Sequence, residues 1–139
     1  MDIRYEKRNA VIIKSRQGKY PCGNDGWVKN TIIAVNNAIE RNFTILSSVG
    51  MNTHELVLWA ANKFGGKQTI IYPLAPHEDK SAAIESTITD FNIDIDRATF
   101  RFIPPAGHNK KSNWRKRDEL MISTAHYAVS YTHLTLPTN

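Results

Sequence analysis

The segment FTILSSVGMNTHELVLWAANKFGGKQTIIYP, residues 43–73, decides the fold class of this chain. Residues 43–47 are a short apolar run typical of a buried strand, and residues 68–73 are a second such run. Between them, residues 53–63 have the length and composition of a helix, which the glycines at 65–66 end. A strand, a helix and a strand in this order predict a βαβ unit with two parallel strands.

The same alternation extends over the rest of the chain. Further strands are predicted at 9–15, at 98–103 and from near His126, and further helices at 27–41, 81–91 and 114–124. The sequence therefore predicts an α/β fold, a Rossmann-like parallel sheet of about five strands with helices on both faces, truncated at the C-terminus. Ligands of such sheets bind at the carboxyl edge, so we expect the loops at 15–26, 47–53, 73–80 and 104–114 to lie there.

The composition fits one compact domain with a real core, because 41% of the 139 residues are hydrophobic. The net charge of +5 permits an anionic partner without demonstrating one. No apolar run is long enough to cross a bilayer or to form a signal-peptide core, so no membrane partner is expected. The single cysteine, Cys22, cannot form an internal disulfide, which favours a cytoplasmic location.

The end of the chain does not match the rest. VSYTHLTLPT, residues 129–138, turns to Ser, Thr and His where the sheet needs a buried apolar strand. This string resembles the translation of a transposase-end adapter used in preparing DNA sequencing libraries. We therefore expect an incomplete Rossmann-like ligand-binding domain at 1–129 and a non-native tail at 130–139, as in a metagenomic fragment whose natural sequence continues after Val129.

Two predicted strand ends offer groups that suit an anion. Arg16 has paired donors for a phosphate or carboxylate, and Ser15 adds a hydroxyl beside it. In the 47–53 loop, Gly50 allows amide groups to turn toward a ligand, and the following helix start adds unpaired N–H groups. The candidate ligand-binding residues of this loop are Ser47, Ser48, Gly50, Asn52 and Thr53. Glu55 is interpreted as a capping partner rather than a catalytic base.

A cluster of five cations lies at residues 110–117. Three of them, Arg115, Lys116 and Arg117, stand at the predicted helix start, where each costs about 0.3–1 kcal/mol against the helix dipole. A bound anion would reverse that balance, so Arg115 and Arg117 are candidate ligand-binding residues. Arg117 is expected to face the ligand and to be removable without loss of the fold. The alternative is a solvated charged face.

Several segments together resemble a known family. AVIIKSR, TILSSVG, GGK, TIIYPLAP and WRKRDELMISTAHYAV occur in the order and spacing of the Rossmann-type domain of the DNA-processing protein A family. A similar pattern occurs in the related lonely-guy phosphoribohydrolases of the same nucleotide-sensing superfamily. The resemblance covers about residues 9–129 and implies a ligand site made by Ser15, Arg16, the 47–53 loop, Arg115 and Arg117. Lys14 stands where the pattern has glycine, and SSVGMN is shorter than the family's Gly-rich loop.

Three functions remain open at this point. The first is binding of a nucleotide or another phosphate-bearing small molecule at the carboxyl edge. The second is a single-stranded DNA-binding module that uses the 110–117 cluster on the phosphate backbone. The third is a phosphoribohydrolase acting on a nucleoside monophosphate, for which Glu119 or a downstream residue would supply the acidic group.

The sequence gives no support for a metal site, a cofactor or a catalytic residue, and it leaves the oligomeric state open. The histidines lack metal-ligand spacing and one cysteine cannot build a thiolate site, so neither a metal nor a cofactor is expected. No catalytic residue is assigned. Assembly into a homo-oligomer is an open alternative.

Overall fold

The computed structural model describes residues 9–14, 26–50, 52–73, 79–103 and 110–131, in which strands and helices alternate. No helix in these ranges is both long enough and apolar enough to span a membrane. α4 begins one turn earlier than the predicted start at Trp114. In chain order the elements are β1 (Asn9–Lys14), α1 (Gly26–Glu40), β2 (Thr44–Ser48), α2 (Asn52–Lys63), β3 (Gln68–Tyr72), α3 (Lys80–Phe91), the 3-10 helix η2 (Ile95–Arg97), β4 (Ala98–Phe102), α4 (Lys110–Thr124) and β5 (Tyr127–Tyr131).

The strands form one sheet in the order β4-β3-β2-β1-β5, and each neighbouring pair is parallel. From β1 to β4 each new strand is added on the same side, whereas β5 pairs with the other side of β1. The strand order therefore reverses between β1 and β5, as in doubly wound α/β sheets. This arrangement confirms the predicted Rossmann-like fold class.

Three helices cover one face of the sheet. Ala10, Ile12 and Ile45 are buried against α1 and α2 in a cluster that includes Val35 and Val57. Farther along the sheet, Ile70 and Tyr72 of β3 pack with side chains of α2 and α3. Because side chains of a strand alternate between faces, the strand residues that lie between these in the sequence belong to the opposite face of the sheet.

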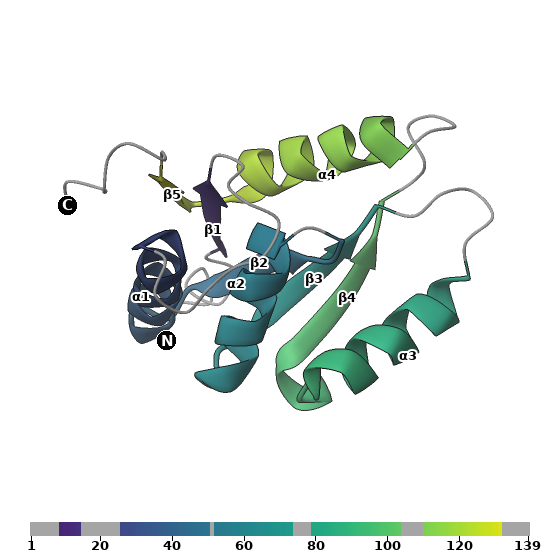
Figure 1. Cartoon of the computed structure of the whole chain (residues 1–139), viewed down its shortest axis with the longest axis horizontal. Helices are drawn as coiled ribbons and strands as arrows, with labels where there is room; N and C mark the ends of the chain where they lie inside the picture. The colour runs from purple at the N-terminus through teal and green to yellow at the C-terminus, as the bar shows by residue number, and fades with distance from the viewer. Residues whose placement is uncertain (1–8, 15–25, 51, 74–78, 104–109, 132–139) are drawn as a thin grey trace, which may run out of the picture.

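Only α4 covers the second face in the described part of the chain. Val11, Leu46 and Ile71 are buried there with Met121 of α4 and with Ile103, which follows β4. Figure 1 shows α4 on this side of the sheet and α1, α2 and α3 on the other. The prediction of helices on both faces is confirmed.

β5 is longer than the sequence indicated. It pairs with β1 residue for residue, with Ser130 opposite Ile13 and Tyr131 opposite Lys14. These two residues were assigned to the non-native tail, yet they take part in the sheet. The tail's origin stays a prediction, and residues 132–139 lie outside the described part of the chain.

Candidate ligand-binding site

The carboxyl edge of the sheet is the edge to which the predicted site segments are attached. All strand pairs are parallel, so the chain leaves every strand at the same edge. The four loops named from the sequence each follow a strand and are therefore attached to that edge. Crevices outside the carboxyl ends of strands, at the point of order reversal, are the usual ligand sites of this fold.

Ser47 and Ser48, at the end of β2, are both fully buried. The Ser47 hydroxyl donates to Oε1 of Gln68 at 2.8 Å, on the face covered by α2. The Ser48 hydroxyl donates to the carbonyl oxygen of Ile71 at 2.6 Å, on the face covered by α4. Both hydroxyls therefore join β2 to β3, and neither is exposed to solvent. Their role in ligand binding stays a prediction.

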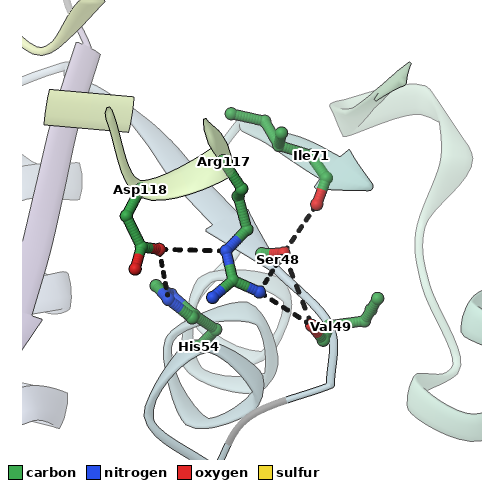
Figure 2. Close-up of polar contacts among 6 residues, drawn as sticks. All are labelled: Ser48, Val49, His54, Ile71, Arg117 and Asp118. Atoms are coloured by element: carbon green, nitrogen blue, oxygen red, sulfur yellow. Dashed lines mark hydrogen bonds and ion pairs between the residues drawn. The ribbon is translucent and has the colours of Figure 1, made fainter. Parts of the chain in front are cut away.

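Arg117 of α4 lies directly above Ser48 and is also fully buried. Its Nη1 donates to the Ser48 hydroxyl at 3.4 Å and to the carbonyl oxygen of Val49 at 3.3 Å, and its Nε donates to Oδ1 of Asp118 at 3.0 Å (Figure 2). These bonds fix α4 to the end of β2. The expectation that Arg117 can be removed without loss of the fold disagrees with this burial, because buried charges that lose partners are costly.

Asp118 connects Arg117 to the start of α2. Its Oδ1 lies 3.0 Å from Nε of Arg117 and 3.4 Å from Nε2 of His54. Burial alone would raise the pKa of Asp118, but the hydrogen bond from His54 and the charge of Arg117 outweigh it and hold that pKa below its ordinary value. The carboxylate therefore stays ionised and joins two helices that lie on opposite faces of the sheet.

The 47–53 loop turns at Gly50, whose φ of +93° is a conformation that favours glycine. The Gly50 N–H donates to Oε2 of Glu55 at 3.0 Å. Glu55 therefore accepts from a backbone N–H two residues before α2 begins, whereas a capping-box carboxylate accepts from the residue immediately before the helix. Its role as a capping partner stays a prediction. Thr53 is partly exposed in the first turn of α2. An amide expected to face a ligand is therefore bound by the protein's own carboxylate.

Arg115 and Lys116 differ from Arg117 in being exposed. Neither forms an ion pair with any residue in the described ranges. They lie in the second turn of α4, because the helix begins at Lys110, and the dipole acts mainly within the first turn. The predicted repulsion by the helix start is therefore weaker than the sequence indicated.

Several predicted residues lie outside what the structure describes. Ser15 and Arg16 fall in the undescribed segment 15–25, and the side chains of Asn52, Lys110 and Lys111 are likewise outside the described set. Their positions in the sequence still attach them to the carboxyl edge. Their contribution to binding stays a prediction.

Two residues of the site were missed by sequence reasoning. His54 and Asp118 occupy ordinary polar positions on two predicted helices, and nothing in their spacing linked them. Only the position of α4 over β2 brings them together. In the described ranges, no group of three or more His, Cys, Asp or Glu side chains is arranged to hold a metal ion.

Comparison with known proteins supports the fold. The sequence matches no protein-family model and no curated protein. The structure is similar to that of DNA processing protein A from Helicobacter pylori, whose single-stranded DNA binding mode has been described, with a TM-score of 0.56 and 12% identity. The match covers 97% of this chain and 60% of that chain, so this chain spans 60% of the length of the solved protein. The resemblance to DNA-processing protein A is confirmed at the level of fold, and that to the phosphoribohydrolases stays a prediction.

Proposed function

We propose that this chain binds single-stranded DNA through the phosphate backbone at the carboxyl edge of the sheet. The observation that carries the proposal is the pair of exposed cations Arg115 and Lys116, which have no ion-pair partner in the described part of the chain. Cationic side chains along a groove are the usual means of holding a single strand without sequence preference. The DNA-binding protein of similar fold supports this choice of ligand.

The burial of Arg117 favours the DNA proposal over a small nucleotide. A nucleotide site was expected to use Arg117, yet its guanidinium binds Ser48, Val49 and Asp118. The exposed cations next to it can contact a phosphate chain that passes over the surface. Lys116 and Arg115 are therefore the residues expected to contribute most to backbone binding.

The test is fluorescence anisotropy of a labelled thymidine oligonucleotide over a range of salt concentrations. We expect the double variant Arg115→Ala/Lys116→Ala to bind about tenfold more weakly at low salt, equivalent to about 1.4 kcal/mol. The slope of log affinity against log salt should fall by about 1.4, because each contact with a single-strand phosphate contributes about 0.7.

The matched control is Lys63→Ala/Lys67→Ala. These two exposed lysines lie at the end of α2 and just before β3, at the opposite edge of the sheet, so the control removes the same charge. Equal loss of affinity in both double variants would show that net charge, not this surface, binds the DNA, and would contradict the proposal. Absence of binding by the unmodified protein would do so as well.

A nucleotide remains the second candidate because the strand order reverses beside β1, whose end leads into Ser15 and Arg16. Under this proposal Arg16→Ala weakens nucleotide binding at least tenfold, about 1.4 kcal/mol. Calorimetric titration with a panel of nucleoside phosphates measures the effect. Unchanged affinity in this variant, for a nucleotide that the parent binds, would exclude Arg16 from the site.

A further inference from the structure

The face of β4 that α3 does not cover is unusual for a parallel sheet. Strands of such sheets are normally apolar on both faces because helices cover both. In β4 the side chains alternate instead. Phe100 and Phe102 pack against the core below α3, whereas Thr99 and Arg101 are exposed on the opposite face. This exposed face belongs to the side of the sheet on which α4 lies.

The register of the strands places Arg101 in the same row across the sheet as Ser48, to which Arg117 donates. Ser48 of β2 pairs with Ile71 of β3, and Ile71 pairs with Arg101 of β4. Arg101 is therefore two strands away from the serine that Arg117 binds, about 10 Å across the sheet. α4 covers Ile71 but leaves Arg101 exposed. The uncovered area thus begins beside α4 at the level of its second turn.

The geometry of α4 places Lys116 on the side of this uncovered area. Successive residues of a helix are about 100° apart, so Lys116 and Asp118 lie on opposite flanks of Arg117. Asp118 reaches His54 on the side of β1, while Ile71 lies on the other side of Arg117 (Figure 2). Lys116 consequently points along the flank that faces β3 and β4.

We propose that Arg101, Thr99 and Lys116 form a cationic shelf that binds the phosphate backbone of a single nucleic-acid strand. The shelf continues the path of the strand from α4 across the open face of β4. Its floor is polar, with the partly exposed Thr69 of β3 paired beside Thr99. Neither β3 nor β4 contains an acidic residue, so the charge of Arg101 is not neutralised from within the floor.

This inference rests on the proposed DNA binding and adds a surface to it. Arg101 could instead protect the edge strand, since a charged side chain there discourages pairing with another sheet. That role requires no ligand, so the two differ in what charge changes do to DNA affinity. A phosphate path predicts loss when the cation is removed and gain when a cation is added nearby.

The experiment uses the same oligonucleotide anisotropy assay on the full chain. We expect Arg101→Ala to weaken binding about fivefold at low salt and Arg101→Lys to retain most of the affinity. Arg101→Glu should weaken binding more than Arg101→Ala, and Thr99→Lys should strengthen it about threefold. Both positions are exposed, so these variants are expected to fold, which circular dichroism verifies.

Lys67→Glu, at the opposite edge of the sheet, is the control for charge reversal. The proposed shelf is contradicted if Arg101→Glu reduces DNA affinity no more than Lys67→Glu does, or if Thr99→Lys does not increase DNA affinity. The proposed function is judged separately, by the parent protein and Arg115→Ala/Lys116→Ala. DNA binding that depends on Arg115 and Lys116 but not on Arg101 would refute the shelf alone.

Discussion

Replacement of Arg117 by alanine is expected to destabilise the fold strongly, although two neighbouring cations can be removed at little cost. The guanidinium is fully buried and donates to the Ser48 hydroxyl, the Val49 carbonyl and the Asp118 carboxylate. Alanine removes all three bonds at once. It also removes the side chain that joins α4 to the end of β2.

The magnitude follows from these contacts. Loss of the charged donor to the partly buried carbonyl oxygen of Val49 costs about 1–3 kcal/mol. A cavity left by a long buried side chain adds about 2–5 kcal/mol, depending on how far the site collapses. Asp118 is about half exposed, so water replaces Arg117 as its partner, and the loss of this ion pair adds little to the cost. We therefore expect Arg117→Ala to lower the free energy of unfolding by about 3–8 kcal/mol, a large part of the stability of a domain of this size.

The assay is urea unfolding followed by circular dichroism, with Arg115→Ala as the matched control. Arg115 has the same chemistry two residues away but is exposed, so its removal should change stability by less than about 0.5 kcal/mol. Arg117→Met keeps much of the side-chain volume, so it should recover the stability lost to the cavity but not the stability lost with the hydrogen bonds. Equal stability of Arg117→Ala and Arg115→Ala would refute the argument from burial and hydrogen bonding.

Three further predictions follow from other contacts. Because the pKa of Asp118 is lowered, its carboxylate stabilises the fold above the ordinary pKa of 3.8, and this stabilisation is lost as the pH falls through the lowered pKa. Urea unfolding at several pH values should therefore show a smaller loss of stability in acid for Asp118→Asn than for the parent. Tyr72→Phe removes a buried hydroxyl 2.7 Å from Thr87 and should cost about 0.5–1.5 kcal/mol in the same assay. Thr87→Val should then cost less in this variant than in the parent, because only its bond to the Ala83 carbonyl remains to be lost. Gly66→Ala would place a Cβ 2.6 Å from a side chain of α1 and should cost about 1–3 kcal/mol by thermal unfolding, whereas Gly26→Ala, where nothing lies within 4 Å, should not destabilise.

Most of the fold could be predicted from the sequence because the signals were local. Short apolar runs between helical segments recur along the chain, and parallel pairing follows from that alternation. The start of α4 was misplaced by one turn, since residues 110–113 lack apolar periodicity and sequence alone indicates helix boundaries poorly. The strand order was also beyond sequence reasoning, because it depends on pairing between residues far apart in the chain.

The candidate site was predictable in position but not in the state of each side chain. Parallel strands fix the edge to which the loops are attached, so the sequence alone could assign the 47–53 loop and the start of α4 to that edge. Burial was not predictable, because it depends on how α4 lies over β2. His54 and Asp118 were missed for the same reason, since their contact joins two helices on opposite faces of the sheet.

Three consecutive cations consequently have different environments, and helix geometry accounts for this. A step of about 100° per residue turns Arg117 into the sheet and leaves Arg115 and Lys116 outside. Inside, Nε and Nη1 of the guanidinium donate to three partners within the protein, which offsets part of the cost of burying its charge. An anionic ligand would have to reach a fully buried side chain to bind Arg117, whereas Arg115 and Lys116 are exposed to solvent. Ligand affinity at this edge should therefore depend on the exposed pair, and the buried arginine should act mainly through stability.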